Sequence, residues 1–492
     1  MTIQFPFENT YAALPDRFYA HIEPTPVAAA KLIHLNRGLA LHLGLDPDWL
    51  ASPAGIDVLA GTRIPEGAEP IAMAYAGHQF GQFVPQLGDG RAILLGEVVD
   101  RDGVRRDIQL KGAGATPFSR RGDGRAALGP VLREYLLSEA MAALHIPTTR
   151  ALAAVTTGET IAREALVPGA VLTRVASSHI RVGTFQFFAA RGDAEGVRLL
   201  ADHVIARHYP EARASEHPYR ALLESVIGRQ AKLIAQWLLV GFIHGVMNTD
   251  NMSVAGETID YGPCAFMDGY HPATVFSSID QNGRYAYVNQ PRIATWNLAR
   301  LAEALLPLLA EETDEAVAEA EKALDSFAPQ FDAAFHAGMR RKLGLFTARE
   351  DDPRLARDLL DTMTENHADF TLTFRSLSDA ALSSADGEPI RRLFVNPTDF
   401  DGWVARWRQR LSDEPQNDSV RQTAMREVNP AYTPRNHRVE AVIQAAVEKN
   451  DFAPFEEFLT VLTNPFEEHK AFAHYADPPE PHERVQQTFC GT

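Results

Sequence analysis

The sequence predicts an α+β fold in which a strand-rich N-terminal lobe precedes a helical C-terminal lobe. Up to about residue 190, short β-rich runs alternate with Gly-containing turns, whereas longer segments with helical periodicity follow. A chain of 492 residues also exceeds what one hydrophobic core usually supports, which favours several packed units. We therefore expect four parts: an N-terminal extension over 1–70, a strand-rich lobe over 71–190, a helical lobe over 191–475 and a tail over 476–492.

Strands are expected mainly between residues 92 and 176. Residues 92–99 and 107–111 are rich in β-forming residues, and the Asp-Arg-Asp-Gly between them is typical of a hairpin turn. Two further strand-like runs cover 149–160 and 161–176. In the otherwise irregular extension, the apolar residues of 26–45 predict one helix.

Helices are predicted where apolar residues recur every three or four positions. One such pattern marks an amphipathic helix within 125–146, and another marks a long buried helix within 221–245. Residues 295–327 hold at least two more helices, and most of the chain after them is expected to be helical. A short hairpin is expected over 252–259, just after the long helix.

The composition limits the classes of partner. A formal net charge of −17 argues against non-specific binding to nucleic acid or to an anionic membrane. The segment from Arg101 to Arg133 nevertheless contains eight Lys or Arg and three Asp, so a basic island suited to a small polyphosphate lies within an acidic protein. Because the first residues lack a secretory signal and no run of 18 apolar residues occurs, we expect a cytoplasmic protein with no membrane partner.

Two features upstream of residue 140 are typical of phosphate binding. Gly88 and Gly90 stand in a turn between strands, where backbone N–H groups can approach an anion, and Arg91 adds a positive charge. Lys111 ends a strand and Glu134 lies on the following helix, the order in which a kinase fold aims a lysine at nucleotide phosphates. A simple hairpin, and an unrelated surface Lys and Glu, are the alternatives.

A Gly- and Arg-rich segment over 112–129 predicts a flexible positive loop over a bound nucleotide. Guanidinium groups bind phosphates bidentately, so arginines that converge on such a site can clamp a triphosphate. Spacing alone does not show that they converge, and a solvated linker is the alternative. The loop residues and the later arginines of this hypothesis are Arg120, Arg121, Asp123, Gly124, Arg174 and Arg181.

The segment His-Gly-Val-Met-Asn-Thr-Asp-Asn-Met-Ser over 244–253 resembles a phosphotransferase catalytic loop. Val246 stands where a kinase has its catalytic Asp, so Asp250 is the predicted acceptor of a hydroxyl proton. Asn251, together with Asp260 at the head of Asp-Tyr-Gly, is predicted to bind Mg²⁺ through hard oxygen ligands. The alternative is ordinary turn chemistry, which also favours Asn and Asp.

Five stretches make the chain similar to the selenoprotein O family, and this resemblance implies a protein-kinase-like two-lobed fold. The stretches are AYAGHQFGQFVPQLGDGRA, QLKGAGATPFSRRGDGRAAL, REYLLSEAM, SSHIRVGTFQFF and HGVMNTDNMS with the following TIDYGPCAFMD. The resemblance implies a pseudokinase-like protein adenylyltransferase that binds ATP in a flipped orientation. It transfers AMP to Ser, Thr or Tyr hydroxyls of proteins, and UMP transfer from UTP is also attributed to the family.

The resemblance also implies roles for the matching residues. Asp250 would accept the proton, and Asn251 with Asp260 would bind Mg²⁺ or Mn²⁺. The pairing of Glu134 with Lys111 is predicted from the kinase-like order of strand and helix described above. The residues implied to hold the nucleotide are Gly88, Gly90, Arg91, Lys111, Asp123, Gly124, Arg174 and Arg181, with Asp260 at the same site.

Only two cysteines are present, Cys264 and Cys490, which excludes a disulfide-rich scaffold and a Cys-based zinc site. Family members with selenocysteine carry it third from the end, the position of Cys490 here, and Cys264 lies in the segment that corresponds to an activation loop. We hypothesise that the two form a reversible disulfide that gates the site and exchanges with a thiol redox partner. Two unrelated reduced thiols are the alternative.

Two other functions stay open at this point. A γ-phosphoryl-transferring kinase would more naturally retain an Asp at position 246. A catalytically silent nucleotide-binding scaffold has no need of a base together with metal ligands, so the joint presence of Asp250, Asn251 and Asp260 disfavours it.

Overall fold

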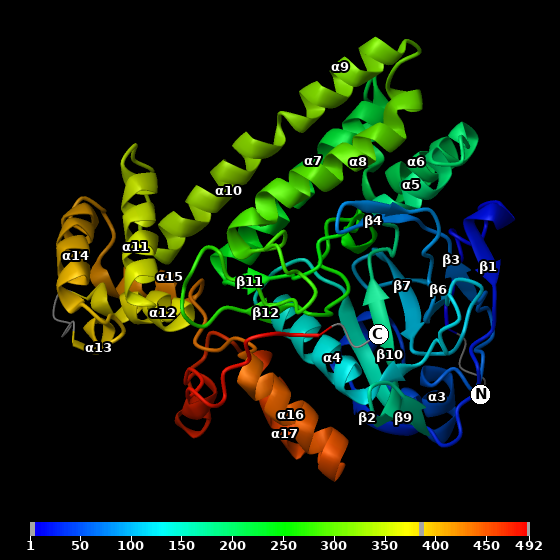
Figure 1. Ribbon diagram of the computed structural model, residues 1–492, viewed down its shortest axis with the longest axis horizontal. Coiled ribbons are helices and arrows are strands. Elements are labelled where there is room, and N and C mark those ends of the chain that lie inside the picture. Colours follow the sequence, from blue (N-terminus) through cyan, green and yellow to red (C-terminus); the bar gives the residue numbers. More distant parts are fainter. Residues whose placement is uncertain (1–4, 383–387, 490–492) are drawn as a thin grey trace.

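The computed structural model describes residues 5–382 and 388–489. A large antiparallel sheet and the helices around it form one part of the molecule, and an assembly of helices forms the other (Figure 1). The predicted α+β, two-lobed, kinase-like fold agrees with this arrangement. How the four predicted parts divide the chain stays a prediction.

The main sheet has eight strands within the described residues. Seven run in the order β1-β3-β6-β7-β10-β9-β2, and β8 pairs with β10. The four strand-like runs predicted between residues 92 and 176 correspond to β6, β7, β9 and β10. The strands are β1 (Tyr19–His21), β2 (Lys31–Leu35), β3 (Ile71–Met73), β6 (Ala92–Val99), β7 (Arg105–Lys111), β8 (Ala126–Ala127), β9 (Arg150–Ala162) and β10 (Leu166–Ala176).

Two of these strands come from residues before 71. The helix predicted over 26–45 is wrong in its first half, because β2 pairs with β9 and only α1 (Arg37–His42) is helical. Asn36 marks the boundary, since its side chain accepts a hydrogen bond from Leu39 N and caps the helix. Upstream of this cap, pairing with the sheet outweighs local helical propensity.

The helices fall into two groups. Those around the sheet are α1, α2 (Pro47–Leu50), α3 (Pro53–Leu59), α4 (Leu128–Ala143), α16 (Asn436–Lys449) and α17 (Ala453–Leu462). The others are α5 (Val182–Ala189), α6 (Ala194–His208), α7 (Pro218–Leu239), α8 (Gln290–Leu309), α9 (Thr313–Leu324), α10 (Phe327–Lys342), α11 (Asp352–Asn366), α12 (Phe370–Ala380), α13 (Glu388–Arg391), α14 (Pro397–Leu411) and α15 (Asp418–Arg426). The predicted amphipathic helices correspond to α4, α7, α8 and α9.

The two faces of the sheet pack on different helices. Ile93 and Val171 share one hydrophobic core with α1, α2 and α3, whereas Leu94 and Leu172 share another with α4. Side chains alternate between the faces along a strand, so Arg174, two residues after Leu172, points to the α4 side. The strand period thus delivers a charged side chain of β10 to the helix that carries Glu134.

Helices from the end of the chain hold α4 in place. In Figure 1, α16 and α17 lie beside α4, although some 300 residues separate them along the chain. Arg133 of α4 forms an ion pair with Glu440 of α16 at 3.1 Å, and its Nε donates to Gly262 O at 3.1 Å. The same residue therefore ties α4 both to the C-terminal helices and to the segment after Asp260.

Two small antiparallel pairs complete the described strands: β4 (Gly77–Gln79) with β5 (Gln82–Val84), and β11 (Phe242–Ile243) with β12 (Ala265–Phe266). The second pair encloses the loop over 244–264. The hairpin predicted over 252–259 is wrong, because Ser253 bridges to Arg181 and Thr258 bridges to Thr148 instead. Buried backbone groups need partners, and here segments on the sheet side supply them.

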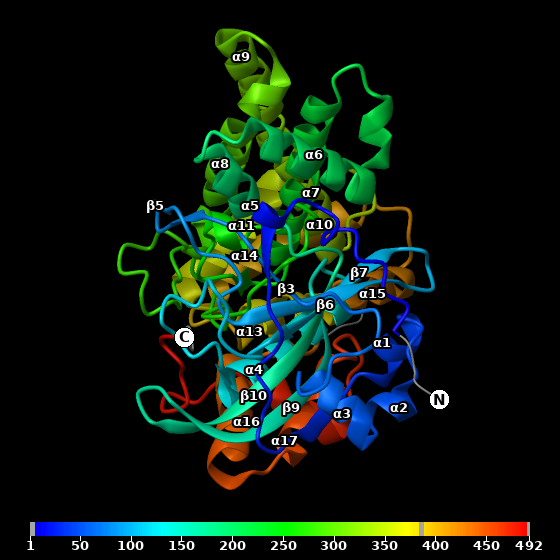
Figure 2. The ribbon, with the colours of Figure 1, turned by 90° about the vertical axis from the view of Figure 1, so that its right-hand side faces the viewer.

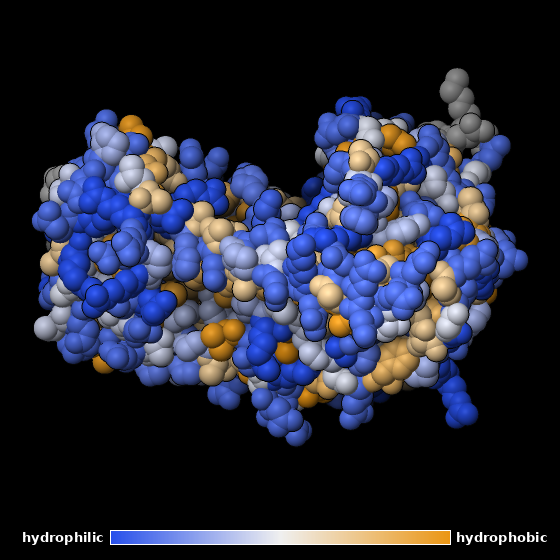
Figure 3. All heavy atoms as spheres, turned by 90° about the horizontal axis from the view of Figure 1, so that it is seen from above, coloured by the Kyte–Doolittle hydropathy of each residue, from blue (hydrophilic) through white to orange (hydrophobic). Residues whose placement is uncertain are grey.

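One face of the molecule and the length of its helices bear on a possible membrane span. Hydrophilic residues cover most of the face seen in Figure 3, with small scattered apolar areas. Within the described ranges, none of the helices is both long and apolar enough to cross a membrane.

Figure 2 shows the helices α5 to α8 above the sheet and α16 and α17 below it.

Candidate active site

A cavity of about 810 Å³ is lined both by residues of the sheet region and by the loop over 244–264. Two segments face this same space: the basic loop over 112–129, and the segment over 244–253 that resembles a catalytic loop and is called the catalytic loop below. Their spacing in the sequence could not show that they lie together. The lining includes Gly88, Gly90, Arg91, Lys111, Asp123, Gly124, Arg174, Arg181, Asp250, Asn251 and Asp260. Every residue predicted to hold nucleotide or metal, or to accept the proton, therefore lies around one cavity.

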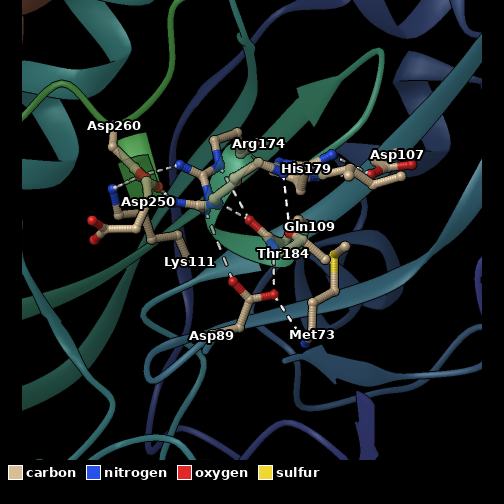
Figure 4. Close-up of polar contacts among 12 residues, drawn as sticks. Met73, Asp89, Asp107, Gln109, Lys111, Arg174, His179, Thr184, Asp250 and Asp260 are labelled. Atoms are coloured by element: carbon tan, nitrogen blue, oxygen red, sulfur yellow. Dashed lines mark hydrogen bonds and ion pairs between the residues drawn. The ribbon is translucent and has the colours of Figure 1, made fainter. Parts of the chain in front are cut away.

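Three of the positive side chains that line the cavity, of which Figure 4 labels Lys111 and Arg174, meet at Asp260. Its Oδ1 accepts from Arg174 Nη1 at 2.6 Å and from Lys111 Nζ at 3.2 Å, and its Oδ2 accepts from Arg181 Nη1 at 2.5 Å. Burial by itself would raise the pKa of Asp260, but Arg181, Arg174 and Lys111 outweigh burial and hold this pKa well below its ordinary value. The φ of Asp260 is 63°, in the left-handed region where strain gathers at functional sites.

Glu134 supports two of these cations from α4. Its Oε2 accepts from Lys111 Nζ at 2.5 Å, and its Oε1 accepts from Arg174 Nη1 at 3.2 Å. Gln109 lies directly opposite Arg174 on β7, and its Oε1 accepts from Arg174 Nε at 3.2 Å and Nη2 at 2.5 Å. Arg174 is only 1% exposed, so its direction is set by buried partners. Sequence reasoning missed Gln109, because its role depends on the strand register.

Arg181 connects the cation cluster to the catalytic loop. Its Nη1, already bonded to the carboxylate described above, also donates to Asp250 O at 2.7 Å. Its guanidinium carbon lies 4.7 Å from the ring centre of Tyr75, a cation–π contact that the sequence did not reveal. The turn before Arg181 is held by Asp107, whose Oδ2 accepts from His179 N and Nδ1, both at 2.9 Å (Figure 4). Burial lowers the pKa of His179 to about 4, so this ring is neutral at pH 7.

The glycine turn contains a buried carboxylate that sequence reasoning also missed. Asp89 accepts hydrogen bonds from Met73 N and Gln109 Nε2, both at 3.1 Å (Figure 4). Burial raises the pKa of Asp89 to about 6. Gly88 has a φ of 70°, and a Cβ there would lie 2.3 Å from the ring of Phe118. The glycine thus lets the basic loop pack closely on the turn, while its approach to an anion stays a prediction.

The basic loop is braced at one point and open at another. Arg163 Nη1 and Nη2 donate to Asp123 at 2.8 and 2.9 Å, and Arg125 N donates to the same carboxylate at 2.9 Å. Arg120 and Arg121 are exposed and have φ values of 48° and 72°. Across the part of the chain that the structure describes, their side chains make no hydrogen bond or ion pair, which leaves them available to an anionic ligand.

The catalytic loop presents Val246, Asp250 and Asn251 to the cavity. Asn251 Nδ2 donates to Val246 O at 3.0 Å, so its amide oxygen is the atom available to a cation. Asp250 is 7% exposed. Burial raises the pKa of Asp250 to about 6, while the hydrogen bond from Gln79 and the charge of Arg181 act in the opposite direction. A carboxylate with a pKa near neutrality suits a general base.

The oxygen donors of the loop fit a divalent ion that is shared with a nucleotide. Asp260 supplies a carboxylate and Asn251 an amide oxygen, both hard ligands of the kind that Mg²⁺ takes together with phosphate and water. Among the described residues, no group of three or more His, Cys, Asp or Glu side chains is arranged to hold a metal ion. Phosphate oxygens would therefore have to complete the coordination.

The tail approaches the segment that carries the first cysteine. Cys264 is buried next to Pro263, whose carbonyl accepts from Thr488 Oγ1 at 2.5 Å. Thr488 N also donates to Phe276 O at 2.7 Å. Cys490 lies outside the described residues, so the hypothesised disulfide with Cys264 stays a prediction.

Comparisons with known proteins identify the family of the chain. A family model described as "Protein adenylyltransferase SelO" matches residues 1–463. The chain is 69% identical over 492 residues to a protein nucleotidyltransferase YdiU of Rhodopseudomonas palustris (strain BisB5), and the match covers all of both chains. Proteins of the same name from Bradyrhizobium sp. (strain BTAi1 / ATCC BAA-1182) and Methylorubrum populi (strain ATCC BAA-705 / NCIMB 13946 / BJ001) are also 69% identical over full length. The predicted resemblance is confirmed, and the chain belongs to the protein adenylyltransferase SelO family.

Proposed function

We propose that the protein transfers AMP from ATP to Ser, Thr or Tyr hydroxyls of proteins and releases pyrophosphate. The main support is the single cavity that brings Asp250 together with the oxygen donors Asn251 and Asp260 and with the basic loop. The family description and the name of the relatives, protein nucleotidyltransferase, support transfer to proteins. Transfer of UMP from UTP is a second reaction of the same site, since the cavity offers phosphate-binding groups that both nucleotides share.

The residues act mainly by positioning and by charge. The acceptor hydroxyl gives its proton to the carboxylate of Asp250 while its oxygen attacks the α-phosphorus. The bond between this phosphorus and the oxygen that bridges to the β-phosphate breaks, and pyrophosphate leaves. Lys111 and Arg174 are held in place to neutralise phosphate oxygens, and the open arginines Arg120 and Arg121 receive the pyrophosphate.

A divalent ion completes the proposed site. Asn251 and Asp260 would hold Mg²⁺ or Mn²⁺, which neutralises charge on the phosphate oxygens of the bound nucleotide. The nucleotide itself would be held by Gly88, Gly90, Arg91, Lys111, Asp123, Gly124, Arg174 and Arg181, with Glu134 orienting Lys111. We place the protein in the cytoplasm, with protein substrates as its partners and with no nucleic-acid partner.

Labelled nucleotides test the reaction. The protein is incubated with a soluble protein extract and with ATP that carries label on either the α- or the γ-phosphate. We expect label in acceptor protein from α-labelled ATP only, because the α-phosphorus is attacked. Asp250→Ala serves as the control, since it keeps the cavity and removes the proton acceptor.

The other outcomes identify the alternatives. Label from the γ-phosphate would mean a kinase, and no label from either position would mean a nucleotide-binding scaffold. The same assay with α-labelled UTP measures UMP transfer, and parallel assays with Mg²⁺, Mn²⁺ or a chelator measure the metal requirement.

We further propose that Cys264 and Cys490 form a reversible disulfide that regulates the site and exchanges with a thiol partner. Thr488 contacts the carbonyl of Pro263, so the chain two residues before Cys490 lies beside the segment of Cys264. Counting thiols in unfolded protein after oxidising and after reducing treatment tests this proposal. We expect no thiol after oxidation and two after reduction, whereas two thiols in both samples would contradict the disulfide. The variant Cys490→Ser is the control and keeps one thiol throughout.

A further inference from the structure

The β4–β5 hairpin makes an unusual set of contacts with the catalytic loop. His78 N donates to Thr249 Oγ1 at 2.7 Å, Gln79 Nε2 donates to Asp250 Oδ2 at 3.0 Å, and Phe80 N donates to Asn248 Oδ1 at 3.0 Å. Three successive residues of the hairpin thus bind the side chains of three successive residues in the loop over 248–250. These three hydrogen bonds align residues 78–80 with residues 248–250, although the two segments lie about 170 residues apart in the chain.

The hairpin is itself fixed on the helices α5 and α8. His78 Nδ1 lies 2.8 Å from Gln186 Nε2 of α5, and the His78 ring packs edge-on against Trp296 of α8 with centroids 5.2 Å apart. Phe80 packs against Tyr285, whose hydroxyl donates to Asn248 Oδ1 at 2.6 Å. The backbone at position 79 is therefore held in place through both of its neighbours, His78 and Phe80.

The carboxylate of Asp250 has two oxygens in different surroundings. Oδ2 accepts the hydrogen bond from Gln79. Oδ1 is buried and has no hydrogen-bond partner among the described residues, and a Cβ added at Gly77 would lie 3.0 Å from it. A buried carboxylate oxygen without a donor costs free energy, so loss of the Gln79 contact would leave the carboxylate of Asp250 less stable in its present position. The hydrogen bond from Gln79 therefore sets the direction of this carboxylate.

We propose that Gln79 is a positioning residue for nucleotidyl transfer, which holds the carboxylate of Asp250 toward the acceptor hydroxyl. Gln79 and Asp250 both line the cavity, so the carboxamide borders the space that the acceptor enters. A carboxamide donates to the carboxylate without competing for the proton that Asp250 takes up. Without this donor, the carboxylate can rotate about its side-chain bonds, and fewer molecules hold it in line with the attacking hydroxyl.

This inference depends on the proposed role of Asp250 as proton acceptor, and the test separates the two. Gln79→Glu keeps the size of the side chain but replaces the donor by a second carboxylate, whereas Gln79→Ala removes the side chain. Gln82→Ala is the matched control, because Gln82 pairs with Gln79 across the same hairpin but its side chain is exposed. The measurements are kcat and the KM for α-labelled ATP, together with thermal unfolding of each variant.

We expect both Gln79 variants to lower kcat by about 10- to 100-fold, the range for losing a partner that orients a functional side chain. The KM for ATP should stay within about 2-fold of wild type, because Gln79 does not contact the phosphate-binding cations. Gln82→Ala should behave as wild type. Adding Gln79→Ala to Asp250→Ala should cause no further loss, because the group to be oriented is gone.

Wild-type kcat in Gln79→Glu would overturn the inference by itself, since that variant removes the donor and places a second carboxylate beside Asp250. A loss that is equally large in the Asp250→Ala background would overturn it as well, because Gln79 would then act elsewhere. Wild-type activity of Asp250→Ala alone would instead contradict the proposed function and leave no base for Gln79 to position.

Discussion

Replacing Asp260 by Ala is expected to lower kcat for nucleotidyl transfer by about 10²- to 10³-fold or more. Asp260 is the common partner of Lys111, Arg174 and Arg181, and the proposed ligand of the divalent ion. Its loss removes a metal ligand and leaves three cations without their shared counter-charge. The assay is transfer from α-labelled ATP over a range of Mg²⁺ concentrations, in which the dependence on Mg²⁺ should also weaken.

Two controls separate chemistry from folding. Asp260→Asn keeps the shape of the side chain and one oxygen but removes the negative charge. It should therefore lose activity, while it disturbs the packing less than Asp260→Ala does. Asp268→Asn removes a carboxylate that pairs with Arg435 away from the cavity, and it should keep wild-type kcat. Wild-type activity of Asp260→Ala would show that the metal assignment is wrong.

Replacing Arg174 by Met is expected to lower the free energy of unfolding by about 3–5 kcal/mol, the range for removing one partner of a buried ion pair. Glu134 and Asp260 would both lose a buried partner, and Gln109 Oε1 would lose both of its donors. Urea unfolding followed by circular dichroism measures the change. Transfer activity should fall as well, because Asp260 and Lys111 lose part of their support.

The matched control is Arg191→Met. Arg191 is exposed, its guanidinium carbon lies 3.5 Å from the ring centre of Phe187, and its side chain donates to Pro85 O. Its loss should therefore lower the free energy of unfolding by less than about 1 kcal/mol. Arg174→Lys keeps a charge but not the fork that reaches Gln109 and Asp260 together, and its stability should lie between those of the wild type and Arg174→Met. Equal stabilities of Arg174→Met and Arg191→Met would contradict the central role of the buried arginine.

Several elements follow from local residue order. The runs that form β6, β7, β9 and β10 show in the sequence as β-rich segments, and α4 and α7 show as apolar residues at helical spacing. These predictions succeed because a strand or a helix repeats its buried positions at a fixed short period. The helix expected over 26–45 failed in its first half because the pairing of β2 with β9 is a long-range contact that no local period reports.

The residues of the candidate site also differ in how far residue order alone indicates them. Asp250, Asn251 and Asp260 stand in one short segment and match a motif, so residue order alone could suggest them. Gln79, Tyr75 and Gln109 lie in stretches that resemble the family, but nothing in the residue order indicates their roles, because each acts through a partner that is distant in the chain. The hairpin expected over 252–259 failed for the same reason, since its backbone forms bridges with Arg181 and Thr148 instead of an internal strand pair.

Residue order was therefore enough to predict the fold class, the family and the chemical groups of the site, since these depend on periodicity and on motifs that are contiguous in the chain. Only the tertiary structure decided that Lys111, Arg174 and Arg181 converge on Asp260, and that the hairpin places Gln79 on Asp250. Convergence depends on strand register, on the packing of α4 against the sheet and on the helices α16 and α17 that hold it. Contacts between residues 79 to 171 positions apart leave no repeating pattern in a single sequence, because their spacing along the chain is free to vary.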